Sequence, residues 1–186
     1  MLKRVRLHQD RPIPSELKRL YEANFPIEER IPWPRLLESL DHTRCIDCYY
    51  EAEELIGMTY LFFFETYIYL GYLVVEESKQ SHGYGGEILE LLKQHYKDKT
   101  ILIDVERLEE EAPNYEERKR RVQFYKNHGF EKLSFHYYFF EVDYDLYSYN
   151  GTVKQSDFKR LLFAHSGPVA KNAVLYNEES VKEDET

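Results

Sequence analysis

The order of the predicted strands constrains the fold of this chain more than any other feature. Three strand-like apolar runs follow one another with only short turns between them, over residues 44–51, 54–64 and 67–75. Such a succession predicts an antiparallel meander. A glycine-rich segment then leads into a helical pattern over residues 85–97 and a buried run over residues 101–106. A helix that connects two strands of one sheet makes them parallel, so the last meander strand and the run at 101–106 are predicted to be a parallel pair.

The remaining elements complete a mixed α/β fold. Apolar periodicity predicts further strands over residues 5–9, 130–139 and 142–149, and further helices over residues 16–24, 35–40 and 114–128. A mixed sheet covered by helices follows from this order. We assign one domain to residues 1–149. Residues 150–186 are interpreted as an extension with a short helix at 157–164 and an acidic tail that is expected to be partly disordered.

The charge balance limits the classes of partner. The chain has 25 basic and 34 acidic side chains, which give a net charge of -9. Nucleic acids and anionic membranes bind basic faces, so this balance argues against both as partners. It favours the attraction of cations, amines among them, although the same charge also simply keeps a protein soluble.

Location and metal content can also be predicted. No apolar run reaches the ~20 residues of a membrane span, and the basic first ten residues lack the apolar core of a signal peptide. We therefore expect a cytoplasmic protein. Its two cysteines, Cys45 and Cys48, lie within one predicted strand and are interpreted as reduced packing residues. Two cysteines are too few for a four-ligand zinc site, and no metal is expected.

The segment "QSHGYGGEILELL", residues 80–92, places three glycines at the start of a predicted helix. The first turn of a helix has unpaired N–H groups and a partial positive charge. Glycines let an anionic oxygen approach those groups closely, which suits a pyrophosphate. No Gly-Lys-Ser/Thr follows, so this is not a Walker loop. The glycine spacing also differs from the G-x-G-x-x-G of dinucleotide-binding folds.

Two motifs together resemble those of the GNAT superfamily of acyl-CoA-dependent N-acyltransferases. Gln80, Gly83 and Gly85 fit the family's acyl-CoA loop, which reads R/Q-x-x-G-x-G/A. "FYKNHGF", residues 124–130, is similar to the F-Y-x-x-x-G-F ending of the family's fourth helix. The resemblance covers about residues 5–149. It implies a GNAT fold, with a central, mostly antiparallel mixed sheet of about seven strands, a splayed parallel central pair and about four flanking helices.

The resemblance implies acetyl-CoA as co-substrate and the residues that bind it. The loop would hold the pyrophosphate through the backbone N–H groups of Gln80, Ser81, His82, Gly83, Tyr84, Gly85 and Gly86. Exposed backbone near Leu73, Val74 and Val75 would pair with the pantetheine arm and polarise the thioester carbonyl. Gln80 stands where arginine is commonest in the family, so charge must come from elsewhere, for example from Lys79.

The resemblance also assigns the chemistry, which is direct attack of a neutral primary amine on the thioester. Tyr125 matches the tyrosine that donates a proton to the departing thiolate; the alternative is a packing role at the end of the helix. Asp104 and Glu106 lie on one side of the run at 101–106 and are both candidates for the base. The alternative is that they are edge carboxylates paired with arginine or lysine. Arg118 stands where many relatives have asparagine, so the start of this helix departs from the family pattern.

The acceptor is the least specified part of the function. Phe25, Glu28, Glu29 and Trp33, in the loop between the first two helices, are candidates for an amine pocket, and a proline-stiffened connector is the alternative. We expect a small-molecule acceptor. The alternatives are a protein N-terminus or lysine, or a non-catalytic module that binds acyl-CoA. The aromatic closing strands, "FHYYFF" and "YDLYSY", offer a face for a homodimer.

Overall fold

The computed structural model describes residues 2–7, 12–25, 27 and 30–178. They form two compact units, Met1–Ile101 and Leu102–Thr186. The described residues contain eight strands and five α-helices, and the predicted mixed α/β class is confirmed. Within the described part of the chain, no helix combines the length and the apolar character needed to cross a bilayer.

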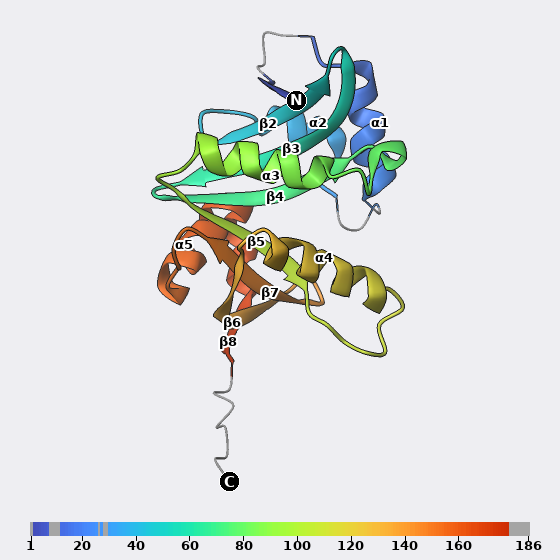
Figure 1. The fold of residues 1–186 in the computed structure, drawn as a ribbon. Coiled ribbons are helices and arrows are strands. Elements are labelled where there is room, and N and C mark those ends of the chain that lie inside the picture. The colour runs from blue at the N-terminus through green and yellow to red at the C-terminus, as the bar shows by residue number, and fades with distance from the viewer. Residues whose placement is uncertain (1, 8–11, 26, 28–29, 179–186) are drawn as a thin grey trace. The chain divides into compact units, whose positions relative to one another are not determined.

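The first unit is built on an antiparallel sheet with the strand order β1-β2-β3-β4 (Figure 1). Its strands are β1 (Lys3–Arg6), β2 (Arg44–Glu51), β3 (Glu54–Phe64) and β4 (Tyr67–Val75). The last three have the bounds predicted for the meander, which is confirmed. Each of these strands is a continuous apolar run joined to the next by a two-residue turn, and such turns define strand ends well, which explains the agreement.

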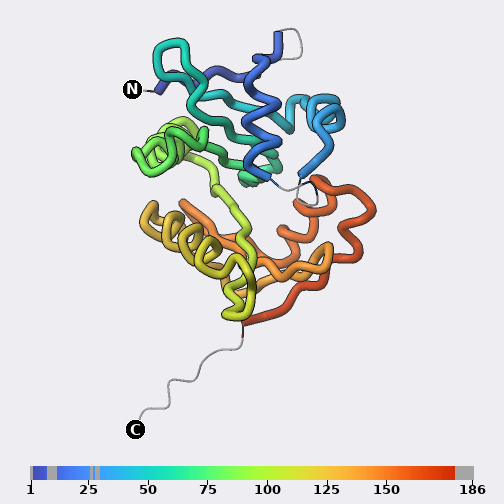
Figure 2. Tube along the Cα trace, turned by 90° about the vertical axis from the view of Figure 1, so that its right-hand side faces the viewer, coloured from blue at the N-terminus to red at the C-terminus, as the bar shows by residue number. Residues whose placement is uncertain are grey.

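Helices cover both faces of this sheet, as the two views of Figures 1 and 2 show. One face packs against α1 (Ser15–Asn24) and α2 (Trp33–Glu38), which bury Leu17, Leu20 and Leu36 against the sheet. The other face packs against α3 (Tyr84–His95). Residues of β2 and β3 therefore alternate between two hydrophobic layers.

The second unit is a smaller sheet with the order β5-β7-β6-β8. Its strands are β5 (Thr100–Glu106), which begins at the boundary between the units, β6 (Glu131–Phe139), β7 (Val142–Tyr149) and β8 (Val174–Asn177). Helix α4 (Tyr115–Asn127) connects β5 to β6 along the chain, and α5 (Gln155–Ser166) follows β7. Helix α5 places Phe158 against Phe135 and Tyr137 of β6, with ring centroids 5.8 and 5.1 Å apart.

Strand β8 was not predicted. It pairs with β6 in antiparallel register, and Glu178 beyond it forms ion pairs with Lys132 and Arg107 at 3.1 and 3.0 Å. A strand of four residues with exposed Val174 and Tyr176 carries little local signal, because its pairing depends on an edge provided by β6. The extension after residue 149 thus contributes a strand to this sheet, whereas the last residues of the acidic tail, for which disorder was predicted, lie outside the described residues from 179 onward.

Other boundaries differ by a few residues. The first strand is Lys3–Arg6 rather than 5–9, and residues 8 and 9 lie outside the described residues. Helix α2 begins at Trp33, two residues early, because Pro34 is well tolerated in a first turn. A short 3-10 turn, η1 (Glu77–Lys79), precedes the glycine loop, and another, η2 (Gly167–Asn172), follows α5.

Candidate functional site

The glycine loop of the first unit ends in a helix start without a side-chain cap. Gly83 is the N-cap of α3 with φ +87° and ψ -5°, and Glu87 is the first residue whose N–H bonds back to the Gly83 carbonyl, at 3.0 Å. The backbone N–H groups of Tyr84, Gly85 and Gly86 thus point out of the first turn. A Cβ on Gly83 would meet nothing within 4 Å, so the left-handed φ, not crowding, favours glycine here.

Gln80 ties this loop to neighbouring elements through its side-chain amide. Its Nε2 donates to the carbonyl of Val75 at 3.1 Å and to Oδ1 of Asn24, at the end of α1, at 3.3 Å. The carbonyl of Gln80 in turn accepts a hydrogen bond of 2.7 Å from Nδ1 of His82. The glutamine therefore holds the loop against the end of β4. An arginine in its place would bring charge but not this amide geometry.

The loop is flanked by two carboxylates that already have donors. Lys79 Nζ donates to Glu54 Oε2 at 2.8 Å, and this hydrogen bond is the main reason why the pKa of Lys79 is raised. The Tyr84 hydroxyl donates to Glu51 Oε2 at 2.5 Å, which likewise raises the pKa of Tyr84. Lys79, expected as a source of positive charge, is thus engaged in an exposed ion pair. Such pairs are weak enough for an anion to compete for the ammonium group.

Strand β4, which leads into the loop, contains a bulge at Gly71. Tyr60 of β3 faces Tyr72, but the next residue, Leu61, faces Leu70, so β4 has one extra residue at this point. A bulge bends its strand and increases the local twist. It lies directly before the predicted pantetheine-binding segment, in which Val74 is buried and Leu73 and Val75 are partly buried.

The candidate acceptor residues that the structure describes belong to an aromatic cluster. The ring centroid of Phe25 lies 4.7 Å from that of Tyr72 and 5.6 Å from that of Tyr21, and Trp33 lies 5.7 Å from Tyr21. The Tyr21 hydroxyl donates to the carbonyl of Ile31 at 3.0 Å. Phe25 and Trp33 are partly buried and pack against the core of the first unit. Glu28 and Glu29 lie outside the described residues.

In the second unit, the "FYKNHGF" segment ends α4 and fixes the position of Tyr125. The Tyr125 carbonyl accepts from the N–H groups of His128 and Phe130 at 3.0 and 3.1 Å, and Gly129 between them has φ +76°. The ring of Phe130 then packs edge-on against the ring of Tyr125, with the two centroids 5.5 Å apart. The motif is thus a helix C-cap that turns the chain back onto the tyrosine ring.

The Tyr125 hydroxyl is kept protonated. Burial raises the pKa of Tyr125 to about 12, while the charge of Arg121 lowers it and that of Asp104 raises it. A phenol with this pKa carries its proton at neutral pH, as a general acid must. The side chain retains partial solvent exposure, so the group is not sealed in the core.

The two candidate bases on β5 have different partners. Asp104 accepts a hydrogen bond at Oδ2 from the hydroxyl of Tyr137. Glu106 accepts from three side chains, namely Arg118 at 3.0 Å, Arg121 at 2.6 Å and Asn114 at 3.3 Å. The arrangement at Glu106 matches the alternative of an edge carboxylate paired with arginine.

The residues that clamp Glu106 were not predicted as a group. Asn114 is the N-cap of α4, and Arg118 and Arg121 follow it in the helix at a spacing of four and three residues. That spacing places side chains on one face of a helix, and it is the signal that could have identified them. Arg118, the departure from the family pattern, thus serves to hold a carboxylate of β5.

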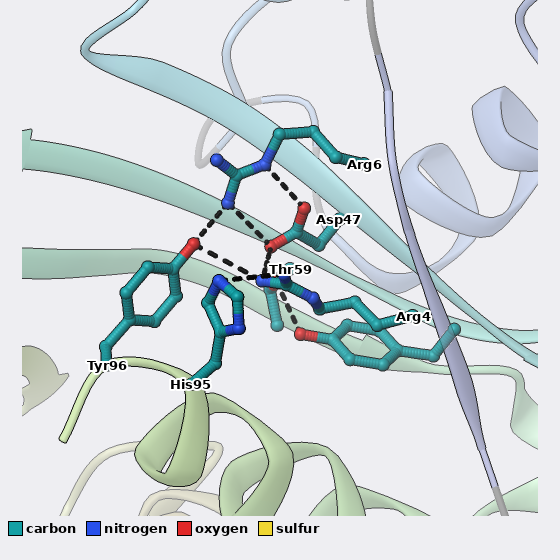
Figure 3. A network of polar contacts seen from close by, with 7 residues as sticks. Arg4, Arg6, Asp47, Thr59, His95 and Tyr96 are labelled. Atoms are coloured by element: carbon teal, nitrogen blue, oxygen red, sulfur yellow. Dashed lines mark hydrogen bonds and ion pairs between the residues drawn. The ribbon is translucent and has the colours of Figure 1, made fainter.

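A polar network in the first unit was also missed (Figure 3). The carboxylate of Asp47, which is fully buried, accepts from Arg4 Nη1 at 3.1 Å and from Arg6 Nε at 2.9 Å. Arg4 also contacts His95 Nε2 at 2.9 Å, and both arginines donate to the Tyr96 hydroxyl. The network ties the end of α3 to β1. Among the described residues, no group of His, Cys, Asp or Glu is arranged to hold a metal ion.

Comparisons with a family model and with curated proteins both match acetyltransferases. Residues 43–132 match the family model described as "Acetyltransferase (GNAT) domain". A protein of Bacillus subtilis (strain 168), "Putative acetyltransferase YjbC", is 32% identical over 107 residues, which are 58% of this chain and 52% of that protein. The chain therefore spans about half the length of this curated relative.

Solved structures have the same fold as this chain, although their sequence identity to it is low. A "Putative acetyltransferase from GNAT family from Bacteroides thetaiotaomicron" is 23% identical with a TM-score of 0.69, over 81% of this chain and 90% of that one. An aminoglycoside 6'-N-acetyltransferase complexed with coenzyme A is 17% identical with a TM-score of 0.61, over 78% of this chain and 96% of that one. The fold predicted from the two motifs is confirmed.

Proposed function

We propose, from the match of residues 43–132 to the GNAT acetyltransferase domain, that the protein transfers the acetyl group of acetyl-CoA to a primary amine. The observation that carries this proposal is the position of Tyr125 at the end of α4, in the "FYKNHGF" segment. Its hydroxyl is protonated at neutral pH, and its backbone is held by the cap of α4, which supports a role as proton donor to a leaving thiolate.

The start of α3 fits the anionic part of acetyl-CoA. The first-turn N–H groups of α3 follow a left-handed glycine, and no side chain caps them. Together with the helix dipole they suit a pyrophosphate. The loop from Gln80 to Gly86 would bind it, and the backbone of 73–75 would pair with the pantetheine arm. What acetyl-CoA supplies is an activated thioester.

In the proposed reaction, the amine nitrogen forms a bond to the thioester carbonyl carbon and the carbon–sulfur bond breaks. The proton lost by the amine passes to a carboxylate of β5, for which Asp104 and Glu106 are the candidates. The sulfur takes the proton of the Tyr125 hydroxyl. Splitting the proton transfers between two groups avoids a free thiolate and a charged ammonium product.

The acceptor is proposed to be a small molecule with a primary amine. The net charge of -9 favours its ammonium form at the surface, and Phe25, Glu28, Glu29 and Trp33 are the proposed contacts. A protein N-terminus or lysine is the alternative acceptor, and a non-catalytic acyl-CoA-binding module is the alternative function. A cytoplasmic location and a homodimer stay predictions.

The direct test is release of free thiol from acetyl-CoA with a panel of amines, which should include peptides with a free N-terminus or lysine. Tyr125→Phe should lower kcat about 100-fold, the lower end of general acid–base contributions, and should leave the Kd of CoA within about twofold of wild type. Tyr115→Phe, at the start of the same helix, is the control and should keep full activity. Tight CoA binding without turnover by any acceptor or cell extract would favour the binding module.

A further inference from the structure

We propose that Arg121 of α4 is a positioning residue for Tyr125, and that its guanidinium stabilises the tyrosine oxygen as that oxygen gives up its proton. This inference rests on the proposed acetyl transfer, in which Tyr125 is the proton donor to the departing sulfur. It names a second residue of α4 that serves the same step. The contacts that carry it lie on α4 and β5.

Arg121 and Tyr125 are about one helical turn apart on α4. Residues at a spacing of four lie on the same face of an α-helix, with about 5–6 Å between their Cβ atoms. Both side chains are partly buried. The helix by itself therefore brings the cation and the phenol to one face, without any contact between distant parts of the chain.

Strand β5 fixes where the guanidinium of Arg121 lies. Oε2 of Glu106 accepts a hydrogen bond from Nη2 of Arg121 at 2.6 Å, and the side chain of Glu106 is 13% exposed. A short, charge-assisted bond to a mostly buried partner restricts a flexible arginine to few conformations. Glu106 thus anchors the guanidinium on the side of α4 that meets β5.

The same pairing places Tyr125 toward β5. Arg121 contacts Glu106, and Tyr125 is close enough to Asp104, two residues earlier on the strand, for that charge to act on its hydroxyl. One helical turn rises about 5.4 Å and two strand residues about 6.6 Å, so the two spacings nearly match. Helix and strand therefore run past one another in opposite directions, and both side chains of α4 face the strand.

The charge of Arg121 acts on Tyr125 in the direction that proton donation needs. Burial is the main reason why the pKa of Tyr125 is raised to about 12, and the charge of Arg121 lowers it. A nearby cation favours the ionised form of a phenol, because that form is negative. Nε of Arg121 is buried and has no acceptor among the described residues, so no acceptor offsets the positive charge at this atom. Burial keeps the proton in place at rest, and Arg121 lowers the cost of releasing it.

The step is one proton transfer. The carbon–sulfur bond breaks and the sulfur keeps the electron pair. The O–H bond of Tyr125 then breaks and an S–H bond forms, which leaves a tyrosinate near Arg121. A partly buried tyrosinate costs free energy, and a positive charge fixed beside it before the reaction lowers that cost. Solvent returns a proton to the oxygen before the next turnover.

The kinetic test compares Arg121→Gln with Arg120→Gln, an exposed neighbour on the same helix whose Nε donates to the Glu116 carbonyl. We expect Arg121→Gln to lower kcat about three- to tenfold, less than Tyr125→Phe, because it weakens the acid without removing it. The Kd of CoA should stay within about twofold of wild type. Arg121→Lys should recover part of the loss, because it keeps the charge. Arg120→Gln should match wild type in every measurement.

Double substitution separates an effect through Tyr125 from a structural one. In Tyr125→Phe protein, adding Arg121→Gln should cause no further loss of kcat, because the group on which Arg121 acts is gone. A further loss as large as that of Arg121→Gln alone overturns the inference, since it would assign Arg121 a structural role. A raised Kd of CoA with an unchanged kcat also overturns it, because Arg121 would then belong to CoA binding.

A second readout needs no turnover. A fluorinated tyrosine placed at position 125 ionises at lower pH than tyrosine, and its ¹⁹F resonance reports this one phenol in a chain with 17 tyrosines. Its titration should move upward by about one pH unit in Arg121→Gln and stay in place in Arg120→Gln. An unmoved titration in Arg121→Gln contradicts the inference even in an active enzyme. If wild-type protein acetylates no acceptor, the proposed function fails, while this titration still decides whether Arg121 acts on Tyr125.

Discussion

The side-chain amide of Gln80 donates a hydrogen bond of 3.1 Å to the backbone carbonyl of Val75. This contact joins the glycine loop to the end of β4, the two backbone segments that are proposed to bind acetyl-CoA. It also explains why a neutral glutamine occupies a position where the family commonly has arginine. Here the residue shapes the loop, and the backbone N–H groups of α3 provide the attraction for an anion.

Gln80→Ala should therefore weaken CoA binding through the shape of the loop. One net hydrogen bond contributes about 0.5–1.5 kcal/mol, so we expect the Kd of CoA to rise about three- to tenfold in calorimetric titration. Gln123→Ala is the control, because Gln123 is an exposed glutamine of α4 whose amide donates to Asn127. An unchanged Kd in Gln80→Ala would mean that the loop keeps its shape without this contact.

Gly57→Ala should destabilise the first unit. A Cβ at this position of β3 would lie 2.4 Å from the carbonyl oxygen of Val74 and 3.0 Å from Cδ1 of Ile88. Backbone atoms cannot move aside easily, so overpacking should cost about 1–3 kcal/mol in the free energy of unfolding. The KM for acetyl-CoA should also rise, since Val74 belongs to the proposed pantetheine segment.

The control for this substitution is Gly71→Ala on β4, where the nearest atom to a new Cβ is Cδ1 of the Tyr60 ring, at 3.0 Å. A side-chain ring can shift by a small amount more easily than a backbone carbonyl can, so the loss measured by urea unfolding should be smaller. Equal losses in the two variants would show that the Val74 carbonyl is not the source of the effect.

Asp47→Asn should be among the most destabilising single changes in the first unit. The buried carboxylate is the shared partner of Arg4 and Arg6, whose side chains are 22% and 32% exposed. Neutralising it leaves two guanidinium groups facing one another. Breaking a buried ion pair costs about 3–5 kcal/mol in the free energy of unfolding. Because both arginines are partly exposed, we expect a loss at the lower end, about 3 kcal/mol.

Thermal and urea unfolding measure this loss, and the exposed Asp98→Asn is the control, which should change stability by less than about 0.5 kcal/mol. A loss as small as that of the control would indicate that solvent already screens the two arginines.

His95 should make stability depend on pH. Because a guanidinium can only donate, Nε2 of His95 must accept from Arg4, and the ring is then neutral. Partial burial and the charges of Arg4 and Arg6 lower the pKa of His95. The unfolded chain then binds the proton more readily than the folded one, so this contribution is present above about pH 6.5 and is lost as the pH falls below it.

Urea unfolding of wild type and His95→Gln between pH 5 and 8 isolates this effect. The difference in unfolding free energy between the two proteins should change with pH by less than about 1 kcal/mol, as for other exposed charge contacts. The wild type should lose more stability than the variant toward acid. Parallel curves would assign the pH dependence to other groups.

The amino-acid sequence by itself determined the local patterns and the two motifs. Strands β2, β3 and β4 have their predicted bounds, because apolar runs of eight to eleven residues separated by two-residue turns are local signals. The helix start at the glycine loop and the cap in "FYKNHGF" are equally local. Both are set by residues within a few positions of each other, and they led to the family whose model matches residues 43–132.

The partners of the charged side chains depended on tertiary structure. The carboxylate of Asp47 accepts hydrogen bonds from Arg4 and Arg6, which lie 43 and 41 positions away in the sequence. Asp104 and Glu106 look equivalent on one side of a strand, yet one meets a tyrosine of β6 and the other two arginines of α4. Strand β8 likewise requires the edge of β6. Local preferences thus determined the elements and the two motifs, whereas contacts between distant residues, which exist only once sheet register and helix packing are set, decided what each carboxylate can do.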